Sequence, residues 1–165
     1  MINFDQFLTP NHILSISKKY IEELERLCIE KQLRFPPPKA PYDRRYFIIE
    51  GASSVILGFF TAPNPERDYD NLAWNRISNN DFINLRTWNQ TKQEGKKTRC
   101  LIVQIWKFPD NSKIAVIIPL DELEKLPSFI TGDFTVKMEN YNFYLKGDEN
   151  KILLKTGIDR VLDYL

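Results

Sequence analysis

The hydrophobic positions near the N-terminus recur at helical spacing. Thr9 and Pro10 have the form of an N-cap and a first helical residue, and the pattern continues to about Leu33. Charged residues occupy the opposite face, and the prolines at 36–38 require the helix to end before them. The pattern predicts an amphipathic helix whose core-facing positions are Ile13, Ile16, Tyr20, Leu24, Leu27 and Cys28.

Farther along the chain, β-branched and aromatic residues form strand-like runs separated by turn-forming residues. Gly51 and two serines separate the first pair of runs, which predicts a hairpin. Pro109, Asp110 and Asn111 separate the next pair, which predicts a second hairpin. The predicted strands cover residues 45–49, 55–61, 100–108, 113–118, 134–145 and 151–155.

The remaining segments have the composition of loops or helices. Residues 62–75 hold two prolines and three asparagines, which favours an exposed loop, whereas residues 78–95 fit a second helix that stops at Gly95. Shorter helical turns are expected at residues 121–126 and 157–165. The order of elements predicts an α+β (or α/β) fold, with the N-terminal amphipathic helix packed on a mixed, largely hairpin-built sheet and a second helix.

Length and composition are those of one ordinary globular domain. The chain has 165 residues, of which 42% are hydrophobic and 27% charged, so a single domain covering residues 1–165 can bury a substantial core. The formal net charge is +1, so the molecule as a whole has no strong field to attract nucleic acid. Binding to DNA or RNA would therefore depend on a local basic patch.

Cysteine and histidine usage limits the metal and redox chemistry. Cys28, Cys100 and His12 are too few and too far apart in sequence for a zinc site or a disulfide framework, although an ion bound by oxygen ligands remains open. The longest apolar runs are too short to cross a bilayer, and the N-terminus has no signal-peptide pattern. We therefore expect a cytoplasmic protein without a membrane partner.

The order of elements in the first part of the chain is similar to one known arrangement. After the predicted helix and a basic connector come Pro41-Tyr42-Asp43, the strand at 45–49, the turn at Glu50-Gly51 and a second strand ending at Thr61-Ala62. In this order, residues 1–62 resemble the restriction-endonuclease-like PD-(D/E)XK nuclease superfamily.

The resemblance implies a magnesium-dependent site built from carboxylates. In the superfamily a helix carboxylate, a strand aspartate and a Glu/Gln-X-Lys triplet hold Mg²⁺ and position the attacking water. By resemblance, Asp43 corresponds to the aspartate and Glu22 or Glu23 to the helix carboxylate, while Glu50 supplies a further carboxylate. The candidate metal ligands are Asp43 and Glu50, and the candidate catalytic residues are Glu23, Asp43, Glu50 and Lys107.

The triplet itself departs from the family pattern. Residues 57–61 of the second predicted strand contain neither an acidic residue nor a lysine, and Ala52 stands where a lysine after Glu50 would be required. Water activation would need a lysine from elsewhere, such as Lys107, which alternation places on the opposite strand face from Gln104. We therefore expect weak or absent cleavage.

Two basic clusters are candidates for contact with nucleic-acid phosphates. One flanks the proline-rich connector, and the other precedes the second hairpin, near a tryptophan whose ring could stack on a base. The alternative is that these residues only solubilise loops. The nucleic-acid-binding candidates are Arg44, Arg45, Trp88, Lys96, Lys97 and Arg99.

Three functions remain to be weighed. The leading hypothesis is a protein that acts on DNA or RNA, either a divergent Mg²⁺-dependent nuclease or a relative that kept binding and lost cleavage. The alternative is a non-enzymatic module, of a bacterial or phage defence system for example, that self-associates or docks a protein partner through an aromatic surface. A small-molecule enzyme using Glu50 or Asp70 as a base lacks a cofactor signature and comes third.

Overall fold

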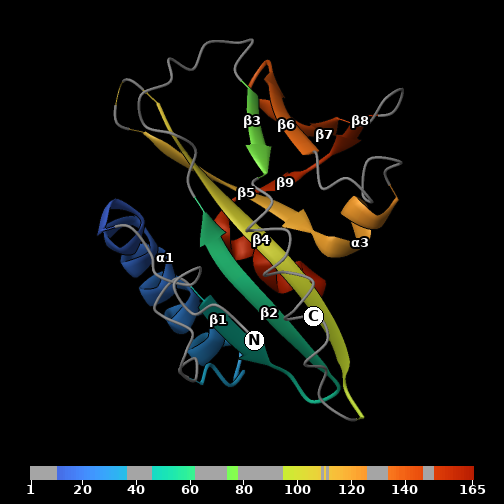
Figure 1. Cartoon of the computed structure of the whole chain (residues 1–165). Helices are drawn as coiled ribbons and strands as arrows, with labels where there is room; N and C mark the ends of the chain where they lie inside the picture. The colour runs from blue at the N-terminus through green and yellow to red at the C-terminus, as the bar shows by residue number, and fades with distance from the viewer. Residues whose placement is uncertain are drawn as a thin grey trace, which may run out of the picture.

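Within the residues that the structure describes, two β-sheets and three helical segments form a layered structure (Figure 1). A five-stranded sheet is the middle layer, with α1 and η3 on one face and a four-stranded sheet and α3 on the other. The computed structural model describes residues 11–36, 46–61, 74–77, 95–108, 110, 112–125, 134–146 and 151–165.

Helix α1 (Asn11–Glu30) lies along one face of the large sheet. Leu24 and Cys28, one turn apart, are fully buried, which confirms that part of the predicted apolar face. The helix ends before the predicted limit near Leu33. The physical reason is that Gln32 has a left-handed backbone conformation, with φ at 56°, which cannot continue a right-handed helix.

The large sheet contains both predicted hairpins. Strands β1 and β2 pair antiparallel, as do β4 and β5, and the two hairpins join through a parallel β2–β4 pair. Strand β9 pairs antiparallel with β5 and ends the order β1-β2-β4-β5-β9. The strand bounds are Tyr46–Glu50 for β1, Ser54–Thr61 for β2, Lys97–Lys107 for β4, Lys113–Pro119 for β5 and Lys155–Thr156 for β9.

The small sheet is antiparallel throughout, in the order β3-β6-β7-β8. Its bounds are Trp74–Ile77 for β3, Phe134–Glu139 for β6, Asn142–Lys146 for β7 and Lys151–Leu153 for β8. Strand β3 corrects the predicted loop at 62–75, whose last two residues belong to it. Its partner β6 lies far along the chain, so local composition could not reveal the pairing.

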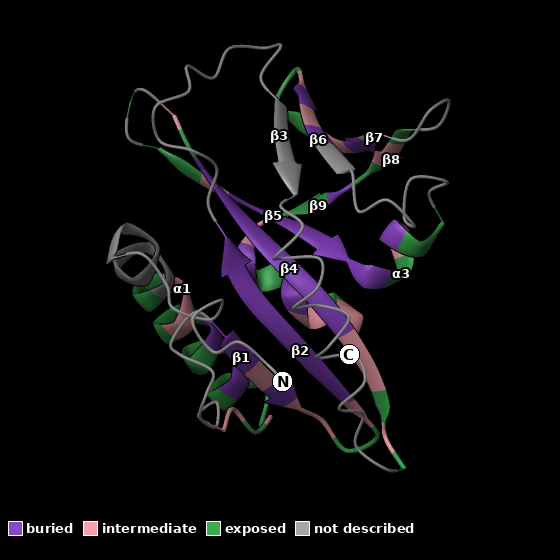
Figure 2. Cartoon of the chain, in the orientation of Figure 1, coloured by how far each residue is buried: buried purple, intermediate pink, exposed green. Residues whose placement is uncertain are grey.

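Side-chain alternation divides the core between the two faces of the large sheet. Phe47 and Ile49 of β1 pack on the α1 side, whereas Tyr46 packs on the small-sheet side. On that side Trp106 meets Phe143 of the small sheet edge to face, with ring centroids 4.9 Å apart. Figure 2 shows β2, β4 and β5 buried along most of their length, as expected for a sheet covered on both faces.

The two short predicted helical turns are also present. They are α3 (Leu120–Glu124) and the 3₁₀ helix η3 (Ile158–Tyr164). The predicted helix at 78–95 lies outside the described residues, apart from Gly95. The α+β class, with an N-terminal helix on a mixed sheet, is confirmed. No helix in the described segments is long and apolar enough to span a membrane.

Candidate functional site

Glu50, a predicted metal ligand, is bonded to the segment that follows α1. Its backbone N–H donates to the carbonyl of Arg34 at 2.9 Å, and its own carbonyl accepts the Arg34 N–H at 3.1 Å. The Arg34 Nη1 atom lies 3.3 Å from Glu50 Oε2, and the glutamate side chain is only 13% exposed. Glu50 thus holds the chain after α1 against the edge of β1.

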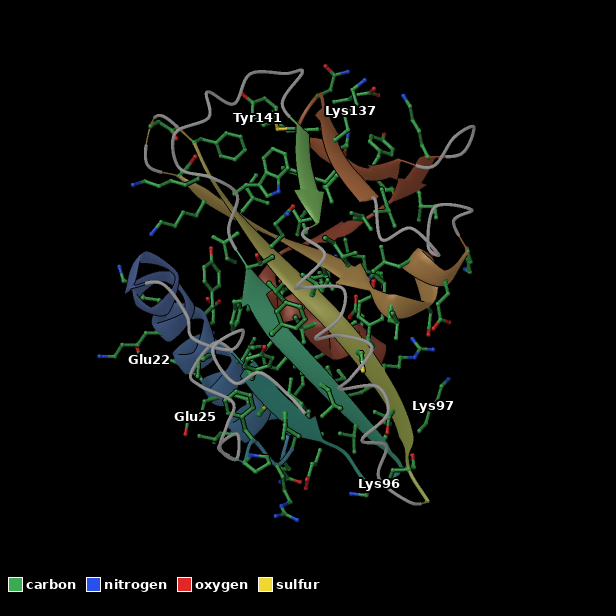
Figure 3. The ribbon with its side chains drawn as sticks, viewed as in Figure 1. Glu22, Glu25, Lys96, Lys97, Lys137 and Tyr141 are labelled. Atoms are coloured by element: carbon green, nitrogen blue, oxygen red, sulfur yellow. The ribbon has the colours of Figure 1, made fainter. Side chains whose placement is uncertain are left out.

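Glu23, the predicted helix carboxylate, is exposed on α1 and does not converge with Glu50. Its neighbours Glu22 and Glu25 lie on the outer side of the helix (Figure 3). Phe47 of β1 faces α1, so alternation directs Glu50, three residues later, to the opposite face of the sheet. The two carboxylates are therefore separated by the sheet.

Lys107, the predicted catalytic lysine, lies at the far end of β4 from Glu50. Glu50 pairs with Val55, which pairs with Thr98 near the start of β4. From Thr98 to Lys107 is nine residues of strand, at about 3.3 Å per residue, hence about 30 Å in all. A single active site cannot draw on both side chains in this arrangement.

The remaining predicted site residues are not placed by the structure. Asp43, Arg44, Arg45 and Trp88 lie outside the described residues, so their assigned roles stay predictions. Across the described segments, no group of three His, Cys, Asp or Glu side chains could hold a metal ion.

The predicted basic cluster at the start of β4 has three different environments. Lys96 is half-buried and its Nζ donates to the carbonyl of Gly51 at 3.4 Å. The Nε atom of Arg99 lies 4.0 Å from Oδ2 of Asp121 in α3, and the guanidinium carbon of Arg99 is 5.9 Å from the centre of the Tyr164 ring. Lys97 is exposed, and its side chain leaves the strand in a different direction from that of Lys96 (Figure 3). Lys97 is the cation of this cluster most open to a ligand.

Charged side chains surround the ring of Tyr164 next to this cluster. Besides Arg99, the Nζ of Lys155 lies 5.2 Å from the ring centre and 3.1 Å from Asp163. Burial raises the pKa of the Tyr164 hydroxyl, and the carboxylates of Glu122 and Asp163 raise it further. Acidic and basic groups both lie near the ring, so their charges largely offset each other here.

A second basic site, which sequence reasoning missed, lies at the other end of β4. Lys107 and Lys113 are directly opposite each other in the β4–β5 register, and both are exposed. The hairpin extends past β2, whose last residue Thr61 pairs with Gln104. Within the described part of the chain, neither amine forms an ion pair. The sequence could have predicted this pair, because a hairpin with its turn at 109–111 places residues 107 and 113 opposite each other.

The turn of this hairpin is fixed by a side chain. The Oδ1 atom of Asp110 accepts hydrogen bonds from the backbone N–H of Ser112 at 2.9 Å and from its hydroxyl at 2.6 Å. These bonds lower the pKa of Asp110. The Phe108 N–H donates to the Ser112 carbonyl at 2.9 Å and continues the ladder beyond the lysines. The lysine pair therefore stands on an ordered scaffold.

Comparisons with known proteins give no relative from which a function could be transferred. No protein-family model matches the chain, and no curated protein and no solved structure is significantly similar to it.

Proposed function

We propose that this chain is a non-catalytic nucleic-acid-binding protein that contacts the phosphate backbone with the exposed end of the β4–β5 hairpin. The observation that carries the proposal is the cross-strand pair Lys107 and Lys113. Directly opposed side chains in an antiparallel pair have Cβ atoms about 4.5–5.5 Å apart, and like charges at that spacing cost stability. An anionic ligand between the two amines would offset this repulsion.

Two lysines of the small sheet differ from this pair. Lys137 and Lys151 of the small sheet share the carboxylate of Glu139, at 3.0 and 2.9 Å. Their hydrogen bonds lower the pKa of Glu139, so the carboxylate stays ionised and offsets part of their charge. Lys107 and Lys113 have no such described partner, which favours them as the ligand contact.

Of the two activities that the nuclease resemblance implies, we propose nucleic-acid binding and not cleavage. Glu23, Glu50 and Lys107 lie in three separate places, and Glu50 is already paired with Arg34. Lys97, at the opposite end of β4, is a further exposed cation that lies apart from this hairpin end. The proposed setting is the cytoplasm, which fits the two buried thiols Cys28 and Cys100.

Direct binding tests the proposal. Fluorescence anisotropy at low salt would compare labelled single-stranded and duplex oligonucleotides with the wild type and with the Lys107→Ala/Lys113→Ala variant. A matched control, Lys125→Ala/Lys151→Ala, removes the same charge from exposed, ion-paired lysines. We expect the affinity of the hairpin variant to fall about tenfold to a hundredfold at 0.1 M salt, and that of the control to fall much less.

Two results would overturn the proposal. One is the absence of binding to any DNA or RNA at low salt, which would favour a protein-interaction module instead. The other is equal affinity of the hairpin variant and the control variant, which would mean that only total charge matters.

A further inference from the structure

The turn between β6 and β7 holds a tyrosine in an unfavourable backbone conformation. Glu139 pairs with Asn142, so Asn140 and Tyr141 form a two-residue loop, and both have positive φ, at 50° and 60°. These angles define a type I′ turn, in which glycine is the preferred second residue. A bulky side chain there is strained, because its Cβ approaches the following carbonyl oxygen. Turn geometry alone therefore does not account for Tyr141.

Burial does not account for Tyr141 either. Its side chain is 69% exposed, and its ring lies 6.3 Å from that of the half-buried Phe108, at an angle of 56°. The hydroxyl has no hydrogen-bond partner within the described residues. Phe108 thus supports one side of the ring while much of it remains in contact with water.

This exposed ring lies at the same end of the β4–β5 hairpin as the proposed phosphate contact. Phe108 directly follows Lys107, the last residue of β4, so the Phe108–Tyr141 contact brings the ends of the two hairpins together. Figure 3 shows Tyr141 next to the end of β4 that is far from Lys97. Alternation directs Lys107 and Lys113 to the α1 side of the sheet and Phe108 to the small-sheet side, so the cationic side chains and the open ring lie on the two faces of the same hairpin end. A single strand that passes around this end could contact both.

We infer that Tyr141 stacks on an unpaired base while Lys107 and Lys113 contact the adjacent phosphates, so that the ligand is single-stranded nucleic acid. This inference rests on the proposed function and adds strand selectivity to it. Proteins that bind single strands without sequence preference combine basic residues that follow the backbone with aromatic rings that stack on bases. A base inside a duplex offers no open face to the ring, so duplex should gain nothing from Tyr141.

Glycine at position 141 separates a binding role from a structural one. Tyr141→Gly removes the ring and restores the preferred Asn-Gly turn, so the denaturation midpoint should stay unchanged or rise. Its affinity for oligo(dT) and oligo(U) should nevertheless fall about tenfold, within the range measured when one stacking ring is removed. Duplex affinity should change less than twofold, and Tyr141→Phe should retain single-strand binding.

The experiment measures oligo(dT), oligo(U) and a mixed-sequence duplex in parallel, so that the two single-stranded ligands are also compared with each other. Equal single-strand affinity of Tyr141→Gly and wild type would overturn the inference. If the lysine variant then still bound more weakly than both the wild type and the Lys125→Ala/Lys151→Ala control, the proposed function would stand without the stacking role. If the lysine variant and Tyr141→Gly both bound like the wild type, the proposed function and the inference would fail together.

Discussion

The ring of Phe47 lies over Gly58 of the neighbouring strand, in the space that a β-carbon would occupy. The two residues are cross-strand partners in the β1–β2 hairpin. A Cβ built on Gly58 would stand 2.1 Å from Cζ of Phe47, and the ring is held in place by Phe60, with centroids 5.3 Å apart. Position 58 therefore requires glycine, because the ring of Phe47 occupies the space on the α1 side of the sheet that a side chain at position 58 would need.

Gly58→Ala should destabilise the protein by about 1–3 kcal/mol, because the ring of Phe47 must leave its packed position. Chemical denaturation measures the change. Gly51→Ala is the control, since a Cβ there would have its nearest contacts at 3.4 Å, and it should cost much less. Shortening the obstructing side chain in a Gly58→Ala/Phe47→Leu variant should cost less than the sum of the single changes. Simple additivity would contradict the steric explanation.

Cys28 should be an unreactive thiol in the folded protein. Burial raises its pKa to about 11, with a smaller contribution from Glu25, so the nucleophilic thiolate is scarce at neutral pH. Because the folded pKa lies above the unfolded value, this residue's contribution to stability is present below the unfolded pKa. It is lost as pH rises toward 11.

Labelling with a thiol reagent at pH 8, in native buffer and in denaturant, checks this prediction. A Cys100→Ala variant isolates the signal of Cys28. Labelling as fast in native buffer as in denaturant would show that the helix does not bury Cys28 as described.

Mg²⁺-dependent cleavage should be weak or absent, because Glu23, Glu50 and Lys107 do not share a site and Glu50 is paired with Arg34. Incubation of plasmid and synthetic duplexes with Mg²⁺ or Mn²⁺, beside an Asp43→Ala variant, tests this expectation. Cleavage by a contaminating nuclease would be unchanged by that substitution. Strong cleavage that disappears in Asp43→Ala would establish an active site around Asp43 and contradict the non-catalytic proposal.

The elements predicted correctly are those whose signal is local. The hairpin around Gly51 and the one around Asp110 have strand-forming runs on both sides of turn residues, and both are present. Strand β3 (Trp74–Ile77) was missed because its strand character depends on pairing with β6. The predicted end of α1 was wrong because Gln32, and not a glycine, adopts the left-handed conformation that ends the helix, so the sequence carries no helix-stop residue there.

The candidate site was less predictable than the fold for the same reason. The Arg34–Glu50 pair joins segments on either side of the proline-rich connector, and no spacing rule reveals it. The Lys107–Lys113 pair follows from the turn once strand register is counted. Tyr141 could not be found, because a type I′ turn is recognised by Asn-Gly and this chain has Asn-Tyr.

The salt dependence of binding to a single-stranded oligonucleotide tests the central claim most directly. Removing one phosphate-binding amine should reduce the slope of log K against log salt by about 0.7 for a single strand, so Lys107→Ala/Lys113→Ala should lower it by about 1.4. The control Lys125→Ala/Lys151→Ala, with the same net charge, should keep the wild-type slope. Equal slopes for all three proteins would contradict the account, because they would show that the end of the β4–β5 hairpin contacts no phosphate.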